Sequence, residues 1–193
     1  SRLQEARKSM GERLRIVCHD RNQGQSASVC TGVDHAWGPV IVTLDGDGQN
    51  DPADIPLLLQ TLAAAPEPGQ LIVCGYRRKR RDTWVKRWSS RIANTVRATA
   101  LNDATPDTGC GLKVFHKALF VDLPRFNHMH RFLPALVRRA GGLSQSVEVN
   151  HRPRLHGQSK YGVGNRLWVG IVDLLGVMWL QRRSFRGGGA REA

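Results

Sequence analysis

Three side chains that carry oxygen atoms stand at alternate positions in one short segment of the chain. Asp45, Asp47 and Gln49 are separated by Gly46 and Gly48. In an extended backbone, residues two apart point to the same side, so the two carboxylates and the amide would share one face. Such oxygens are ligands that Mg²⁺ or Mn²⁺ prefers, and glycines let the backbone approach a ligand closely. We therefore interpret the segment as a divalent metal site that holds a phosphate.

The same segment, Asp45 to Gly48, also has the composition of an ordinary surface turn. The residues before it favour the metal site, because residues 40–44 form a β-branched apolar run that is typical of a strand buried on both faces. In α/β proteins, ligands bind where loops leave the carboxyl ends of such strands. An EF-hand is disfavoured, because no glutamate follows at the twelfth position.

The rest of the chain alternates between segments typical of strands and segments typical of helices. Short apolar runs predict strands over residues 14–18, 40–44, 71–75, 112–115 and 146–150. Apolar residues at helical spacing predict helices over residues 1–13, 26–36, 53–65, 90–101, 117–123, 129–139 and 165–180. This alternation predicts an α/β fold with a mostly parallel sheet and helices on both faces.

The order of the first elements differs from the usual pattern of this fold class. A doubly wound nucleotide-binding sheet normally begins with a strand, whereas the first segment here is a polar and basic helix pattern. We expect the first strand or strands to be missing, so that residues 1–180 form a single, N-terminally incomplete domain. Residues 181–193 are basic and glycine-rich, and we expect them to be a disordered tail.

The composition is that of a globular protein with an excess of positive charge. The chain has 193 residues, 40% hydrophobic and 23% charged, and a net charge of +13. This charge implies an anionic partner, either nucleic acid, an anionic membrane surface or a phosphorylated substrate. The four cysteines are far apart and form no Cys-x-x-Cys pair, so we expect reduced cytoplasmic thiols and neither a zinc site nor a disulfide framework.

Basic and aromatic residues are interleaved in residues 77–91. Trp84 and Trp88 lie four residues apart among many arginines and lysines, which suggests a helix that lies against the core or a membrane interface. The alternative is a solvated face or a disordered loop. Trp168 and Trp179, in the last predicted helix, are expected in the core rather than at a membrane.

Several motifs in a fixed order resemble the family-2 glycosyltransferases of the GT-A fold. They are Asn22-x-Gly24-x-x-Ala27, Thr31-Gly32 and the segment from Asp45 to Pro52. The segments 107–115, 130–134 and 151–166 narrow the resemblance to the polyprenyl-phosphate glycosyltransferases, the dolichol-phosphate mannosyltransferase group. That family also carries Pro-x-x-Asn-Glu and Asp-Asp-Gly-Ser patterns that hold the base and ribose of the donor, and neither is present here.

The resemblance implies an inverting, metal-dependent transfer of a hexose from a nucleotide-sugar to a dolichyl or undecaprenyl phosphate. The subgroup points to mannose from GDP-mannose as the donor. It further implies Mg²⁺ or Mn²⁺ as cofactor, an anionic membrane surface as partner, and a peripheral position at the cytoplasmic face of the membrane.

The resemblance also assigns roles to individual residues. Asp45, Asp47 and Gln49 would bind the metal, and the donor would contact Asn22, Gly24, Asp45 and Gly46. The catalytic set would be Asp47, Asp107 and Arg87, with Asp107 orienting the sugar; residues 107–109 could instead form only a turn. The acceptor phosphate would bind Arg77, Arg87 or Lys86 in its place, Ser90, Arg152, Arg154, Ser159 and Lys160. His130 and His151 are expected to be structural or loop histidines rather than catalytic bases.

Two alternatives belong to other functional classes. A basic nucleic-acid-binding module would explain the charge, but not a buried strand that ends in carboxylates, which repel a phosphate backbone unless a metal intervenes. The second alternative keeps the fold and transfers the sugar to a polysaccharide or a soluble acceptor.

Overall fold

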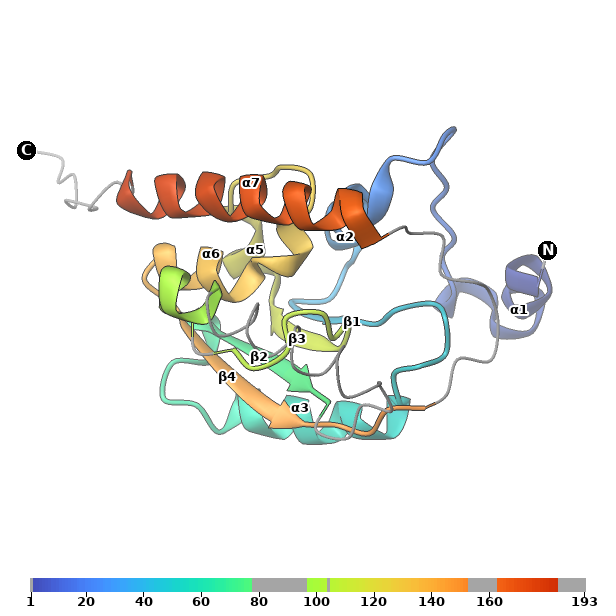
Figure 1. Cartoon of the computed structure of the whole chain (residues 1–193). Helices are drawn as coiled ribbons and strands as arrows, with labels where there is room; N and C mark the ends of the chain where they lie inside the picture. The colour runs from blue at the N-terminus through green and yellow to red at the C-terminus, as the bar shows by residue number, and fades with distance from the viewer. Residues whose placement is uncertain (1, 78–96, 104, 153–162, 184–193) are drawn as a thin grey trace, which may run out of the picture.

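The computed structural model describes residues 2–77, 97–103, 105–152 and 163–183, with only the backbone described for 163–167. A sheet lies at the centre of the molecule (Figure 1). Its strands are β1 (Val40–Thr43), β2 (Leu71–Tyr76), β3 (Lys113–His116) and β4 (Leu143–Glu148). They lie in the order β1-β3-β2-β4.

The sheet is mixed. Strand β3 is antiparallel to both β1 and β2, whereas β2 and β4 are parallel. Strands β1, β2 and β4 therefore run in one direction and β3 runs in the other. The predicted α/β fold is confirmed, and its shared strand direction holds for three of the four described strands.

Helices cover both faces of the sheet (Figure 1). On one side lie α2 (Gly24–His35), α5 (Lys117–Val121), α6 (Leu133–Arg139) and α7 (Val163–Arg182). On the other side lies α3 (Ile55–Ala63). Helix α1 (Arg2–Met10) lies apart from the sheet. Short 3₁₀ helices are Gly11–Arg13, Pro52–Asp54, Pro68–Gln70 and Met129–Arg131, and residues 97–101 are helical.

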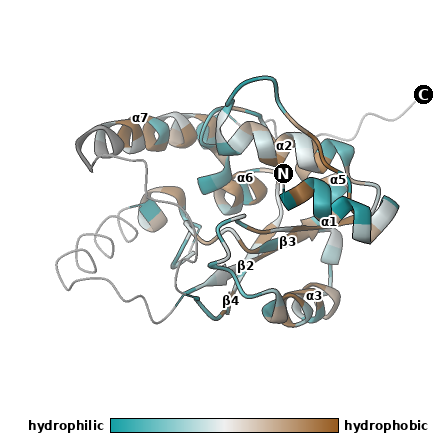
Figure 2. Cartoon of the chain, turned by 90° about the vertical axis from the view of Figure 1, so that its right-hand side faces the viewer, coloured by the Kyte–Doolittle hydropathy of each residue, from teal (hydrophilic) through white to brown (hydrophobic). Residues whose placement is uncertain are grey.

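Strand β2 is buried on both faces, as its continuous apolar run predicts, whereas the residues of β4 are partly buried or exposed. Alternate residues of β2 enter two clusters: Ile72 packs with the helices that include α6, and Val73 packs with Leu58 and Leu62 of α3. Figure 2 shows the matching apolar colour on the strands and on α3. The sheet therefore forms a rigid platform for the loops at its edge.

The predicted strand over residues 14–18 is wrong, since these residues have no strand assignment. Side chains rather than a backbone ladder attach the segment to α2: Arg15 donates to the carbonyl of His35, and His19 Nε2 lies 2.8 Å from Thr31 Oγ1. A strand needs a neighbouring strand, and within the described residues none pairs with this segment.

The core prediction for two tryptophans is also wrong. Trp168 is 67% exposed and Trp179 is 59% exposed. Both lie on the solvent side of α7, together with Val172 and Leu175. On α3, Leu58 and Leu62 are buried as expected, whereas Leu57 and Leu59 are exposed.

A buried ion pair anchors the segment that leads to Asp107. Arg97 bonds to the carboxylate of Asp103, and its Nη2 donates to the carbonyl of Thr105 at 2.7 Å. Burial raises the pKa of Asp103, and the nearby Arg97 guanidinium opposes that shift. This network fixes the backbone two residues before Asp107.

Candidate active site

Four segments meet at one edge of the sheet. The carboxyl ends of β1, β2 and β4 lead to Asp45, Arg77 and His151 respectively. Because β3 runs in the opposite direction, its amino end lies at this same edge, and the residues that precede it are 107–112. The topology therefore brings together the carboxylates, cations and glycine-rich loop that the sequence singles out.

A cavity with a volume of about 1030 Å³ lies between α2, β1, the loop 108–111 and the residues that begin α6. Asp45, Gly46 and Asp47 line it, as do Lys113 and His130. Three of the residues predicted to bind the metal or donor thus share one cavity.

Asp45 is held from three directions. Its backbone N–H donates to Asn50 Oδ1 at 3.1 Å, and Gln25 Nε2 of α2 donates to its carboxylate at 2.9 Å. The carboxylate lies so close to Gly111 that a Cβ atom there would be 2.4 Å from it. Burial raises the pKa of Asp45, Lys113 lowers it, and Asp47 raises it again. The two carboxylates are therefore close enough to repel each other.

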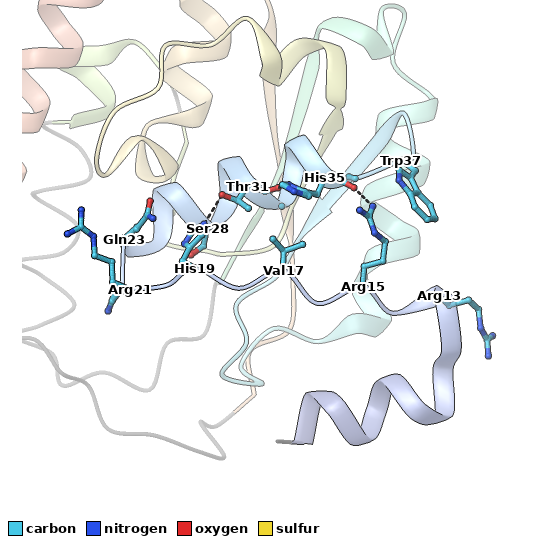
Figure 3. A pocket seen from close by; sticks show the side chains of 13 residues that line it. Arg13, Arg15, Val17, His19, Arg21, Gln23, Ser28, Thr31, His35 and Trp37 are labelled. Atoms are coloured by element: carbon cyan, nitrogen blue, oxygen red, sulfur yellow. Dashed lines mark hydrogen bonds between the residues drawn. The ribbon is translucent and has the colours of Figure 1, made fainter.

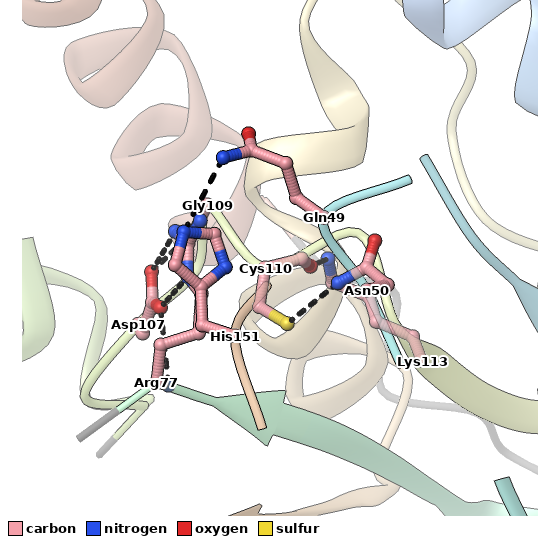
Figure 4. Close-up of polar contacts among 8 residues, drawn as sticks. All are labelled: Gln49, Asn50, Arg77, Asp107, Gly109, Cys110, Lys113 and His151. Atoms are coloured by element: carbon pink, nitrogen blue, oxygen red, sulfur yellow. Dashed lines mark hydrogen bonds and ion pairs between the residues drawn. The ribbon is translucent and has the colours of Figure 1, made fainter. Parts of the chain in front are cut away.

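Asp47 and Gln49 form a tight turn. The backbone N–H of Gln49 donates to Asp47 Oδ1 at 3.1 Å. The Gln49 amide nitrogen lies 3.4 Å from His151 Nε2 (Figure 4), and the backbone N–H of Arg152 donates to the Gln49 carbonyl at 3.0 Å. The turn is therefore fastened to the segment that follows β4.

Arg77 and Asp107 form a two-pronged ion pair (Figure 4). Arg77 Nε lies 2.7 Å from Asp107 Oδ2, and Nη2 lies 3.0 Å from Oδ1. Burial lowers the pKa of the Arg77 guanidinium. The hydrogen bonds and the charge of Asp107 raise this pKa by more, so its net shift is upward. The residues predicted to hold the acceptor phosphate and to orient the sugar are thus direct partners.

Buried polar side chains that were not predicted support this edge (Figure 4). Lys113 is 4% exposed and its ammonium group donates to the carbonyl of Cys110. Asn50 is 5% exposed, and its amide contacts Cys110 Sγ at 3.6 Å. Gln25 directly follows Gly24 of the Asn22-x-Gly24 motif, so that motif was the one available signal for it. His151 opens the basic loop and was expected to be structural.

The donor set fits a hard divalent cation. A cation between the two carboxylates would relieve their repulsion. Gln49, the third predicted ligand, is not among the residues that line the cavity, and its amide lies beside His151. Within the described residues, no three His, Cys, Asp or Glu side chains gather closely enough to hold a metal by themselves. Mg²⁺ typically takes one or two carboxylates and completes its ligands with water and substrate phosphate.

Other predicted residues lie elsewhere. Asn22 lines a separate groove beside α2 with Arg15, His35 and Trp37 (Figure 3). Its Oδ1 accepts from the backbone N–H of Gly24, whose φ of +83° suits glycine at the start of α2. The structure therefore separates Asn22 from the cavity of Asp45.

The predicted acceptor residues are only partly described. Arg152 Nη2 lies 2.6 Å from Asp51 Oδ1, beside the Asp47–Gln49 turn. Lys86, Arg87, Ser90, Arg154, Ser159 and Lys160 lie outside the described residues.

Comparison with known proteins matches this chain to curated transferases. It is 38% identical to a dodecaprenyl-phosphate galacturonate synthase of Rhizobium johnstonii, over 96% of this chain and 56% of that protein. It is 31% identical to an undecaprenyl-phosphate 4-deoxy-4-formamido-L-arabinose transferase of Edwardsiella ictaluri, over 83% of this chain and 48% of that protein. The chain thus spans about half the length of these relatives.

Solved structures agree on the fold. Glucosyl-3-phosphoglycerate synthase of Mycobacterium tuberculosis, in complex with Mg²⁺ and uridine diphosphate, superimposes with a TM-score of 0.59 at 14% identity. The match covers 91% of this chain and 58% of that one, and it supports the GT-A fold. The model of the family described as "Glycosyl transferase family 2" matches residues 2–123. The chain belongs to glycosyl transferase family 2.

Proposed function

We propose that this chain transfers a sugar from a nucleotide-sugar to the phosphate of a polyprenyl lipid, with inversion at the sugar. The observation that carries the proposal is the meeting of Asp45, Asp47 and the Arg77–Asp107 pair at one edge of the sheet. Carboxylates for a metal-bound diphosphate and a guanidinium for a second phosphate are what this reaction needs. The names of the relatives, which act on dodecaprenyl and undecaprenyl phosphate, support the acceptor.

One set of residues would act on the leaving nucleoside diphosphate, and another on the lipid phosphate that is the nucleophile. Asp45, Asp47 and Gln49 would hold Mg²⁺ or Mn²⁺, whose charge stabilises the departing nucleoside diphosphate. Arg77 would position the lipid phosphate, and Asp107 would keep the guanidinium in place through its two contacts. A phosphate oxygen then forms a bond to the anomeric carbon as the bond to the diphosphate breaks. The phosphate is already ionised, so no general base is required.

A six-carbon sugar is the proposed cargo. The resemblance in sequence points to mannose from GDP-mannose, whereas the relative at 38% identity is named for galacturonate. The relative at 31% identity is named for a formamido-arabinose, which is a five-carbon sugar and does not support a hexose. The donor panel below includes the donors of mannose and galacturonate, with UDP-glucose as a further hexose donor.

A donor and acceptor panel tests the proposed function. The chain is incubated with Mg²⁺ or Mn²⁺, a short polyprenyl phosphate, and GDP-mannose, UDP-galacturonate or UDP-glucose. We expect nucleoside diphosphate release from one donor, at least about tenfold faster with lipid than without. Nucleoside diphosphate release at the same rate with and without lipid would indicate hydrolysis or another acceptor. No release from any donor would refute the proposal.

We also propose that α7 places the enzyme on the cytoplasmic face of the membrane as a peripheral protein. No helix in the described ranges is long and apolar enough to cross a bilayer. Trp168, Val172, Leu175 and Trp179 recur at helical spacing and are all more than half exposed on α7. Arg182 and Arg183 lie at its end, and basic residues beside an apolar face favour anionic lipid surfaces.

Leu175→Asp is expected to weaken binding to vesicles that contain anionic lipid by about tenfold or more. The change removes an apolar contact between the side chain and the lipid, and it adds a negative charge. Leu175 is 59% exposed, so the thermal stability should change little. The matched control is Leu57→Asp on α3, where the leucine is 47% exposed on the opposite side of the sheet. Sedimentation with vesicles measures both, and equal losses in the two variants would contradict a specific role for α7.

A further inference from the structure

His130 is bound to a serine far away in the sequence. Its Nδ1 lies 2.8 Å from Ser26 Oγ, and its backbone N–H donates to the same oxygen at 3.3 Å. Ser26, in the first turn of α2, is only 3% exposed. Beside this pair, Cys30 Sγ contacts Met129 Sδ at 3.6 Å. The imidazole is therefore held against α2 at two points and cannot turn without breaking a buried contact.

The two contacts with Ser26 fit one tautomer of the ring. A hydroxyl has one proton to donate, and its oxygen already accepts from the backbone N–H of His130. Its own proton can then be donated to Nδ1, and in that arrangement Nδ1 is the acceptor. A neutral imidazole that accepts at Nδ1 carries its proton on Nε2. The pKa of His130 is lowered to about 4, first by burial and then by Arg131 and Lys113, so the ring is neutral near pH 7.

The ring also lines the cavity that contains Asp45 and Asp47. Since Nδ1 is engaged by Ser26, Nε2 is the nitrogen that remains for a ligand. If the carboxylates hold the metal and diphosphate of a donor, the sugar occupies the part of the cavity beyond them. A sugar presents neutral hydroxyl oxygens, for which a neutral N–H is a suitable partner that does not compete for the diphosphate.

We propose that His130 is a sugar-recognition residue, whose Nε2–H donates a hydrogen bond to an oxygen of the donor sugar while Ser26 fixes the ring. This inference rests on the proposed function and deepens it, because it assigns a residue to the sugar rather than to the diphosphate or the lipid. His130 was expected to be a structural or loop histidine, and its place in the lining of the cavity, with Nδ1 engaged by Ser26 from 104 residues away, indicates a role toward a ligand.

Paired binding measurements test this assignment. Affinity for UDP-galacturonate, UDP-glucose and GDP-mannose is compared with affinity for UDP and GDP, with Mg²⁺ present. We expect His130→Phe to weaken the binding of the accepted nucleotide-sugar about tenfold and to leave its nucleoside diphosphate unchanged. His130→Gln, whose amide nitrogen can replace Nε2–H, should recover most of the loss. Ser26→Ala should lose about threefold, because the ring is kept but its tautomer is released.

Two further measurements separate recognition from a structural role. Nitrogen NMR of the imidazole should report a neutral ring with the proton on Nε2 at pH 7. The matched control, His116→Phe, changes a histidine at the far end of β3 from Lys113 and should leave both affinities unchanged.

The possible failures are distinguishable. Equal losses for nucleotide-sugar and nucleoside diphosphate, no loss for either, or a proton on Nδ1 would each overturn the assignment. If lipid-dependent transfer continues unchanged in His130→Phe, the proposed function stands and only this inference falls. If no nucleotide-sugar binds to the unaltered protein, both fall.

Discussion

Asp47→Asn is expected to abolish metal-dependent sugar transfer while the fold stays intact. Asparagine keeps the side-chain oxygen that accepts from the backbone N–H of Gln49, so the turn that contains the metal ligands is preserved. What it removes is the charge that attracts the cation. The loss of this charge removes several kcal/mol of transition-state stabilisation by the cation, which corresponds to a decrease of about 10³-fold in rate.

The measurement is nucleoside diphosphate release as a function of Mg²⁺ concentration, with the accepted donor and a polyprenyl phosphate. Asp122→Asn, at the end of α5, removes one carboxylate charge outside the cavity and should keep normal activity. If Asp47→Asn retains its rate at saturating Mg²⁺, Asp47 is no metal ligand. If it retains its rate without added metal, the metal assignment fails altogether.

Local patterns in the sequence were sufficient for the turn at residues 45–49 and for the apolar strands on either side of it. β-branched runs before and after residues 45–49 predicted β1 and β2 within one or two residues, because burial on two faces leaves a continuous apolar signature. The helix predicted over residues 26–36 begins two residues earlier, at Gly24, where Asn22 Oδ1 accepts from the glycine N–H.

Strand pairing was not visible locally. Residues 14–18 have a strand-like pattern but no neighbouring strand among the described residues, so they lie beside α2 through side chains. The direction of β3 was hidden for the same reason, because an apolar run carries no information about which neighbour it will pair with. On α7, tryptophans at helical spacing fit both a core face and an exposed face, and the structure exposes them.

The site showed the same division between local and distant contacts. Asp45 and Asp47 were found from their spacing, but the partners of Asp45 come from Gln25 and Gly111, which lie 20 and 66 positions away in the sequence. Arg77 and Asp107 were given separate roles by resemblance, yet they form one ion pair across 30 positions. No spacing rule predicts such a pair, because it depends on how β2 and the loop before β3 meet.

Gly111→Ala is expected to reduce sugar transfer about 100-fold, because the added methyl group would displace the Asp45 carboxylate. The added Cβ would lie 2.4 Å from Asp45 Cγ and Oδ2, far inside van der Waals contact. Asp45 is short and is held by Gln25, and Asn50 fixes its backbone, so it cannot yield without losing its position. A shift of about 1 Å in a metal ligand is enough for a loss of this size.

The comparison variant is Gly69→Ala, where a new Cβ meets nothing within 4 Å. Both variants should unfold within about 1–3 kcal/mol of the unaltered protein in urea, because each adds only one methyl group. Mg²⁺-dependent release should fall in Gly111→Ala alone, with a higher Mg²⁺ concentration needed for half the maximal rate. Normal Mg²⁺ dependence in Gly111→Ala would mean that Asp45 can move without harm, and that Asp47 and Gln49 alone set the affinity for the metal.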